Sequence, residues 1–502
     1  MRDRGLGIGG RGIGLAALLA AVVIPVHAAS LAEKIDKVLA GTNAFWGIQA
    51  VDLESGKMLY QWNAQRFFVP ASNTKLFTSS LALERLGPDF TFRTRVLADA
   101  APDAAGTVHG PLRLMGGGDP NLSARAIPYR KGPITGNPLA AIEELADQIA
   151  AHGVRRVAGD IVGDDTWYLW EPYAAGWGID DPENADGPPI SALTVNDNTV
   201  NLSVAPGARE GDTAGVMLDP PLELFHIENH VVTAAAGASG RIRYSLLPGS
   251  TDLHLWGTIP LGSRPQVLGI GMDDPARYAA MALRKALEDR GIVVEGRAAA
   301  RHELPEDVAD LTGRPPVAEP TGVELARRVS APLIEDLRIT DKVSQNLHAE
   351  LLLRAVGRAK RNLGSFEAGL EELKSFLGEI GIAPEQYNIR DGSGLARLNL
   401  VTPAAVVTLL RHMYHSPLRE QWIGLLPVGG EDGTLANRFV GTPAAGRVHA
   451  KTGSLSHVSA LSGYLQRANG RWVVFSILVN NYNGPTADIR GAMDRICNLI
   501  VE

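Results

Sequence analysis

The stretch Phe68-Val69-Pro70-Ala71-Ser72-Asn73-Thr74-Lys75 opens a run of apolar residues at helical spacing, Leu76, Phe77, Leu81, Leu83 and Leu86. Pro70 disfavours a helix that enters from upstream, so we expect Ser72 at a helix N-terminus. Residues three positions apart share one side of a helical turn, which brings the Lys75 amine to the Ser72 hydroxyl. A serine needs an adjacent base, and a lysine becomes that base when burial or a nearby cation lowers its pKa. The pattern predicts a catalytic pair; the alternative is a capping serine beside a solvated lysine.

A second pattern, Ser344-Gln345-Asn346, precedes an apolar run with the period of a helix. We expect Ser344 to relay a proton between the nucleophile, the lysine and a leaving amine. Asn346 is expected to exchange hydrogen bonds with a substrate amide, and the Gln345 side chain to point away. The alternative is a polar loop that caps the following helix.

A third pattern, Lys451-Thr452-Gly453-Ser454, lies in a strand-like run near the C-terminus. It predicts an edge strand to which an extended peptide adds, with Gly453 allowing close approach. Lys451 and Thr452 would hold a substrate carboxylate, and Lys451 would also be the cation that lowers the pKa of Lys75. The alternative is a plain β-turn.

The composition of the 502 residues is that of an ordinary globular chain, with 45% hydrophobic and 21% charged residues. A net charge of −7, without a sustained basic block, argues against a nucleic-acid partner and allows at most peripheral membrane association. The single cysteine, Cys497, excludes an intramolecular disulfide and a multi-cysteine zinc site. The twelve histidines form no His-Glu-x-x-His pattern, so we expect no metal site.

The order of patterns along the chain divides it into unequal parts. Residues 1–28 carry a positive start, an apolar run and a small-x-small end, which predict a signal peptide and export to the periplasm of a Gram-negative bacterium. Between 89 and 324, short alternating runs separated by turns predict an inserted region of two smaller, mainly β domains. The segments 30–88 and 325–502 would together form one discontinuous catalytic domain. A hairpin over 44–62 and three antiparallel strands over 448–479 would supply its sheet.

Taken together, the three motifs in this order resemble those of penicillin-binding proteins and serine β-lactamases. The chain is most similar to the class C low-molecular-mass penicillin-binding proteins, the D-alanyl-D-alanine carboxypeptidase/endopeptidase family S13. Ser344 lies 272 positions after Ser72, and this family carries two extra domains in that interval. Further segments carry the resemblance: Gly117-Gly118-Asp119-Pro120, Ser191-Ala192-Leu193, Asp391-Gly392-Ser393-Gly394-Leu395-Ala396-Arg397 and His449-Ala450-Lys451.

The resemblance implies an α/β (α+β) penicillin-binding, β-lactamase-like transpeptidase fold, in which helices flank an antiparallel sheet and two mainly β domains are inserted. It implies a serine D-Ala-D-Ala carboxypeptidase, also a D,D-endopeptidase, that acts on peptidoglycan peptides, is acylated by penicillins at Ser72 and needs no cofactor. Backbone N–H groups of Ser72 and Ser454 would hold the oxyanion. A serine β-lactamase and a non-catalytic cell-wall binding protein are the alternatives. The oligomeric state is left open.

The segment Asp391–Arg397 would border the pocket for the stem-peptide side chain, again by resemblance. Ser393 and Arg397 would hold the free carboxylate of a diaminopimelate residue, because a guanidinium binds a carboxylate through two hydrogen bonds. The alternative is a tight turn with a surface arginine. The aromatic and acidic stretch Asp164–Tyr168 of the inserted region is a further candidate for this pocket.

Overall fold

The computed structural model describes residues 29–132, 134–182 and 185–502. The expected signal peptide, residues 1–28, lies outside the described residues. Across the part of the chain that is described, no helix combines the length and the apolar character that a membrane crossing needs.

The centre of the catalytic region is an antiparallel sheet of five strands in the order β19-β20-β21-β1-β2. These strands are β1 (Phe45–Asp52), β2 (Met58–Trp62), β19 (Val448–Leu455), β20 (Val458–Gln466) and β21 (Trp472–Asn480). The hairpin and the three C-terminal strands predicted from the sequence are confirmed. Since β19 stands at the end of this order, the strand that carries Lys451 is an edge strand, as predicted.

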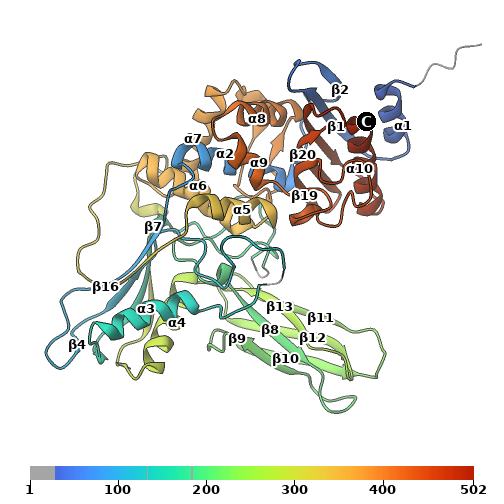
Figure 1. Ribbon diagram of the computed structural model, residues 1–502. Coiled ribbons are helices and arrows are strands. Elements are labelled where there is room, and N and C mark those ends of the chain that lie inside the picture. Colours follow the sequence, from blue (N-terminus) through green and yellow to red (C-terminus); the bar gives the residue numbers. More distant parts are fainter. Residues whose placement is uncertain (1–28, 133, 183–184) are drawn as a thin grey trace, which may run out of the picture.

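Helices cover both faces of this sheet (Figure 1). Helices α1 (Leu31–Ala40) and α10 (Thr486–Val501) pack on one face. Side chains alternate along β21, so that Phe475 and Ile477 join this core while Val474 and Leu478 join the core on the opposite face. The opposite face is covered by α2 (Thr74–Leu86), α5 (Leu333–Lys342), α6 (Asn346–Arg361), α7 (Phe366–Glu379), α8 (Pro403–His415) and α9 (Arg419–Leu425).

Two of these helices begin after a serine or threonine whose hydroxyl caps the first turn. Ser365 precedes α7, and its hydroxyl accepts a hydrogen bond from the backbone N–H of Ala368 at 3.0 Å. Thr402 precedes α8 and accepts from Ala405 at 3.1 Å, with Pro403 in the first helical position. Local chemistry therefore explains where these helices begin.

The first inserted unit is a sheet in the order β15-β7-β5-β3-β16. Two helices, α3 (Ala140–Ala151) and α4 (Pro275–Asp289), pack on it, so this unit is mixed and only the second inserted unit is a mainly β one. Its strands are β3 (Arg93–Ala98), β5 (Leu112–Met115), β7 (Ile161–Leu169), β15 (Ala298–Glu303) and β16 (Val323–Val329). Because β16 pairs with β3, the expected boundary at residue 325 falls inside a strand of the inserted sheet.

The second inserted unit consists of strands only and extends away from the catalytic region (Figure 1). Two three-stranded sheets make it, in the orders β13-β8-β9 and β10-β12-β11. The members are β8 (Thr199–Ala205), β9 (Gly215–Asp219), β10 (His226–Ala234), β11 (Arg241–Ser245), β12 (Asp252–Pro260) and β13 (Gln266–Gly271). Between β7 and β8, parts of residues 170–182 and 185–198 return to the catalytic region, where Trp177 contacts Asp391 and Asp186 contacts Asn346.

Candidate active site

Ser72 lies in a short 3-10 turn, η1 (Ala71–Asn73), that leads directly into α2. Its neighbours Ala71 and Asn73 are fully buried, whereas Ser72 itself is partly exposed. The prediction that Ser72 stands at a helix start is confirmed. The hydroxyl is therefore held by a rigid element and open to a ligand at the same time.

Among the described residues, three groups lie within hydrogen-bond distance of Lys75 Nζ. Two of them can only accept: Asn346 Oδ1 at 2.6 Å and the backbone carbonyl of Ser393 at 2.6 Å. The third is Ser72 Oγ at 3.2 Å, which can also donate. The Asn346 amide is oriented independently, because its Nδ2 donates to the carbonyl of Asp186 at 2.7 Å. The charged amine can donate to all three partners. Once neutral, it can keep its two N–H groups on the acceptor-only partners and accept from the Ser72 hydroxyl through its lone pair.

Burial lowers the pKa of Lys75, so that part of the protein carries a neutral Lys75 amine near pH 7. The side chain is fully buried, and desolvation lowers the pKa of Lys75 to about 8, although the Asp391 and Glu350 carboxylates oppose the shift. The sequence could identify the lysine but not the residues that bury it.

Lys451 on β19 connects the third motif to the second. Its Nζ donates to Ser344 Oγ at 2.8 Å and to the backbone carbonyl of Thr452 at 2.9 Å. Burial, followed by the charge of Lys75, lowers the pKa of Lys451 to about 7. Two buried ammonium groups of this kind titrate together, so one proton leaves the pair between about pH 7 and 8.

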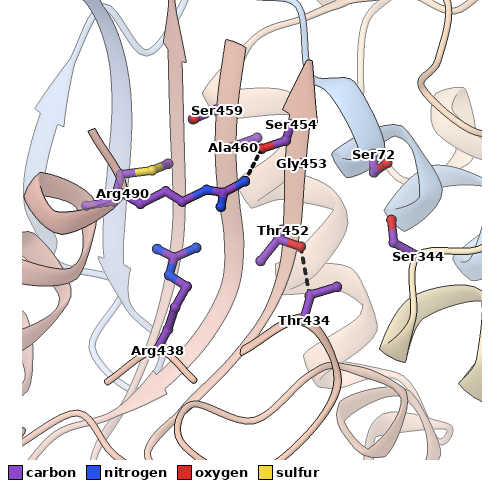
Figure 2. A pocket seen from close by; sticks show the side chains of 11 residues that line it. Ser72, Ser344, Thr434, Arg438, Thr452, Gly453, Ser454, Ser459, Ala460 and Arg490 are labelled. Atoms are coloured by element: carbon purple, nitrogen blue, oxygen red, sulfur yellow. Dashed lines mark hydrogen bonds between the residues drawn. The ribbon is translucent and has the colours of Figure 1, made fainter. Parts of the chain in front are cut away.

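Ser344 stands in the short connection between α5 and α6 with a φ of +65°, in the left-handed region. Ser72 and Ser344 face each other beside β19 (Figure 2). The structure thus brings together Ser72, Lys75, Ser344, Asn346 and Lys451, the five residues predicted to carry the chemistry.

Gly453 allows β19 to lie directly against the turn that holds Ser72. A Cβ atom at this position would lie 2.8 Å from the carbonyl oxygen of Pro70 and 3.1 Å from the Ser72 nitrogen. Asn73 Nδ2 also donates to the carbonyl of Lys451 at 3.0 Å, which ties the turn to the strand. Glycine is therefore required by backbone contact, and the Ser72 nitrogen lies beside the edge strand.

A cleft of 360 Å³ opens over these groups and contains residues that the sequence did not single out. Thr452 Oγ1 donates to Thr434 Oγ1 at 2.8 Å, and Arg490 of α10 donates to Ser454 Oγ at 2.8 Å (Figure 2). Arg490 is exposed. An exposed guanidinium beside Ser454 makes this end of the cleft suitable for an anionic group.

Of the two residues after Asp391 that were expected to bind a substrate carboxylate, Ser393 and Arg397, only Arg397 is accessible. Ser393 is fully buried, and its hydroxyl donates to Asp391 at 3.2 Å, so this side chain is not available to a substrate carboxylate. Its contribution to the site is the carbonyl that accepts from Lys75. Arg397 is exposed and donates to the carbonyl of Ser456 at 3.1 Å, which leaves further guanidinium N–H groups for a ligand.

The inserted region reaches the site through residues within 170–182 and 185–198, and not through the predicted Asp164–Tyr168 stretch. That stretch lies in β7, where Asp164 and Asp165 are buried. Trp177 Nε1 instead donates to Asp391 Oδ2 at 3.0 Å. Periodicity revealed the strand but could not show that the irregular segment after it crosses to the catalytic region.

Gln345 does not simply point away, as expected, but connects the second motif to the inserted region. Its Oε1 accepts from the backbone N–H of Leu347 at 2.8 Å, and its Nε2 donates to Asp197 at 3.1 Å. Burial alone would raise the pKa of Asp197, but Arg125 and the hydrogen-bonded His348 hold it below its usual range. An inserted-region carboxylate thus holds the loop that carries Ser344.

Residues 29–499 match the family described as D-Ala-D-Ala carboxypeptidase 3 (S13). A D-alanyl-D-alanine carboxypeptidase of Actinomadura sp. (strain R39) is 37% identical over 469 residues, covering 91% of this chain and 82% of that protein. The D-alanyl-D-alanine carboxypeptidase DacB of Haemophilus influenzae is 25% identical, with 94% and 91% covered. The crystal structure of penicillin-binding protein 4 from H. influenzae has the same fold, with a TM-score of 0.79, 23% identity and coverage of 93% and 99%. That protein was also solved in complex with a β-lactam, with a TM-score of 0.74 to this chain, 22% identity and coverage of 93% and 99%.

Proposed function

Since the chain belongs to the D-Ala-D-Ala carboxypeptidase 3 (S13) family, we propose that it hydrolyses D-Ala-D-Ala peptides through an ester on Ser72, with Lys75 as the base. The observation that carries this assignment is the hydrogen-bond set of Lys75. When Lys75 is neutral, its two N–H groups remain on the acceptor-only partners and its lone pair faces the Ser72 hydroxyl at 3.2 Å, which is the arrangement that general-base activation of a nucleophile requires.

Acylation begins when Ser72 Oγ attacks the carbonyl carbon of the penultimate D-alanine and its proton passes to Lys75 Nζ. Backbone N–H groups of Ser72 and Ser454 stabilise the negative oxygen. The C–N bond then breaks, and the leaving amine takes a proton from the Ser344 hydroxyl. Ser344 is replenished by Lys451, which donates to it at 2.8 Å. The lysine pair therefore holds one proton before and after the step.

Deacylation uses the same groups in the reverse order. Once the pair has returned its proton to Lys451, the Lys75 lone pair accepts a proton from a water molecule that attacks the ester. The tetrahedral intermediate expels Ser72 Oγ, which takes the proton back from Lys75. Lys75 acts as both the base and the acid of this step, so no further acid or base is needed. The departure of D-alanine leaves the space that the water molecule occupies.

Substrate orientation follows from the edge strand and the charged end of the cleft. An extended peptide adds along β19, with Gly453 permitting close contact. Its terminal carboxylate binds at Thr452, which lines the cleft, and Arg490 adds positive charge through Ser454. Lys451 is fully buried, so it acts on this carboxylate through its charge and not as the direct ligand that the sequence suggested. The same carboxylate position suits β-lactams, so penicillins acylate Ser72.

The proposal extends to peptidoglycan as substrate and to D,D-endopeptidase activity. Exposed Arg397 provides a guanidinium for the free carboxylate of a diaminopimelate residue, a role for which Ser393 is no longer a candidate. Export to the periplasm by a signal peptide over residues 1–28 is part of the same proposal. N-terminal sequencing of the mature protein from a cell envelope fraction tests it: a start within a residue or two of Ala29 supports cleavage.

Mass spectrometry of the mature protein after incubation with benzylpenicillin tests the activity. We expect a long-lived penicilloyl adduct on Ser72, and release of D-alanine from a peptide ending in D-Ala-D-Ala. Rapid penicillin hydrolysis without an adduct would favour a β-lactamase. Neither adduct nor D-alanine from folded protein would favour a binding protein and refute the proposal.

A further inference from the structure

The cleft beside β19 has two ends, which different residues mark. Just after the strand, Arg397 donates to the carbonyl of Ser456 at 3.1 Å, and the proposed function places the side chain of the stem peptide there. Towards the other end, Thr452 is hydrogen-bonded to Thr434 at 2.8 Å (Figure 2). Because the terminal carboxylate binds at Thr452, the leaving residue of a bound substrate lies beside Thr434.

Residues 427–434 form the rim of the cleft at this leaving-group end. The backbone N–H of Ala450 donates to the carbonyl of Pro427 at 3.0 Å, and that of Gly429 donates to the carbonyl of Val448 at 2.9 Å. Both hydrogen bonds join the rim to β19, the strand along which the substrate adds. A substrate that continues beyond its leaving residue therefore has to pass this rim.

A loop of the first inserted unit, between β5 and α3, reaches the same rim. Lys131 Nζ donates to the backbone carbonyl of Glu431 at 3.1 Å. Tyr129 lies against the rim as well: burial raises the pKa of its hydroxyl, and a hydrogen bond with the backbone of Gly433 opposes the shift. These two contacts place the loop beside the leaving-group end of the cleft.

The base of this loop is anchored to the segment that holds the second motif. Arg125 Nε donates to Asp197 Oδ2 at 3.0 Å, and Asp197 accepts from Gln345 at 3.1 Å. The loop is therefore fixed at its base and at the rim, and it offers a defined surface to a ligand.

Arg130 is the charge of this loop that no neighbour compensates. It is exposed, and its side chain has no ion pair or hydrogen bond among the residues that the structure describes. At the contact between loop and rim, two lysines and two carboxylates balance each other: Lys131, Lys342, Glu431 and Asp432. A guanidinium binds a carboxylate through two parallel hydrogen bonds, so the free group of Arg130 suits an anionic ligand.

We propose that the loop bearing Tyr129, Arg130 and Lys131 is the binding surface for the leaving strand of a cross-linked peptide, with Arg130 as the residue that binds a carboxylate of that strand. The proposal rests on the proposed function and names the substrate of its endopeptidase part. The chemical steps are those of acylation and deacylation above, with a diaminopimelate amine as the leaving amine.

The two kinds of substrate differ in what lies beyond the scissile bond. When D-alanine leaves a monomeric peptide, the leaving group ends beside Thr452 and Thr434. When the bond between D-alanine and a diaminopimelate residue is cleaved, the leaving group is a whole stem peptide, which continues past the rim and carries free carboxylates. Arg130 therefore favours cross-linked over monomeric substrates.

The test compares a cross-linked dimer of tetrapeptides with a monomeric pentapeptide ending in D-Ala-D-Ala, both cleaved by the mature full-length protein. The measured quantity is the ratio of kcat/KM for the dimer to kcat/KM for the monomer. Arg130→Ala should lower this ratio about two- to fivefold, the usual effect of one exposed ion pair. Arg130→Glu should lower it about fivefold or more, because it repels the carboxylate. The loss should lie in KM for the dimer and should shrink at high salt, whereas Arg130→Lys should restore most of the ratio.

Arg209→Glu is the matched control. Arg209 is also exposed and lies in the connection between β8 and β9, on the second inserted unit that extends away from the catalytic region (Figure 1). This variant makes the same change in net charge and should keep the wild-type ratio.

A wild-type ratio in Arg130→Glu, or equal losses on the dimer and the monomer, would overturn the proposal. A wild-type protein that is acylated by penicillin and releases D-alanine, but does not cleave the dimer, would also overturn it. Failure of the proposed function is recognised separately, because the wild-type protein would then form no adduct on Ser72.

Discussion

Lys75→Met is the change that tests the assigned base most directly. Methionine nearly preserves the length of the buried side chain but has no lone pair that could accept the Ser72 proton. Burial lowers the pKa of Lys75 from 10.5 to about 8. At pH 7 the neutral fraction thereby increases from about 0.03% to about 9%, roughly 300-fold. The wild-type acylation rate should therefore rise with pH through an apparent pKa between 7 and 8.

We expect Lys75→Met to reduce the rate constant for acylation by benzylpenicillin by about 10²- to 10⁴-fold, the usual loss when a general base is removed. The residual rate should be independent of pH between 6 and 9. Rapid-mixing acylation followed by intact-protein mass spectrometry measures both quantities. Lys57→Met, at an exposed lysine in the β1–β2 turn, is the matched control and should behave as wild type. Near wild-type acylation in folded Lys75→Met, or a wild-type rate that does not change from pH 6 to 9, would refute the assignment.

Three further outcomes are expected. Gly453→Ala should reduce acylation strongly with little loss of stability, because its Cβ would lie 2.8 Å from the Pro70 carbonyl and move the edge strand away from Ser72; an acylation rate within twofold of wild type would contradict this. Arg397→Ala should raise KM for peptides with a free diaminopimelate carboxylate more than for lysine-type peptides, and equal effects in steady-state assays would count against the carboxylate role. Asp197→Asn weakens the contact to Gln345 and should lower the acylation rate constant while non-covalent penicillin affinity is kept; stopped-flow kinetics separate the two, and an unchanged rate constant would argue against a role in holding Ser344.

The sequence by itself determined several of the elements and indicated which residues to examine as the reacting groups. Alternation predicted the β1–β2 hairpin and the three C-terminal strands, and Pro70 with the apolar spacing after it predicted the helix that Ser72 begins. These are local properties, set by side-chain period and turn chemistry over a few positions. Three motifs in a fixed order, with the long interval between the first two, then carried the resemblance to the family that the comparisons show.

Only the tertiary structure decided how the reacting residues behave. The pKa of Lys75 depends on desolvation and on Asp391 and Glu350, residues more than 270 positions away in the sequence. Tertiary packing also brings Trp177 of the inserted region and Arg490 of the last helix to the site. It buries the Ser393 side chain, which therefore cannot serve as a ligand. Burial and charge are properties of a packed environment, and that environment is assembled from segments whose spacing along the chain carries no local signal.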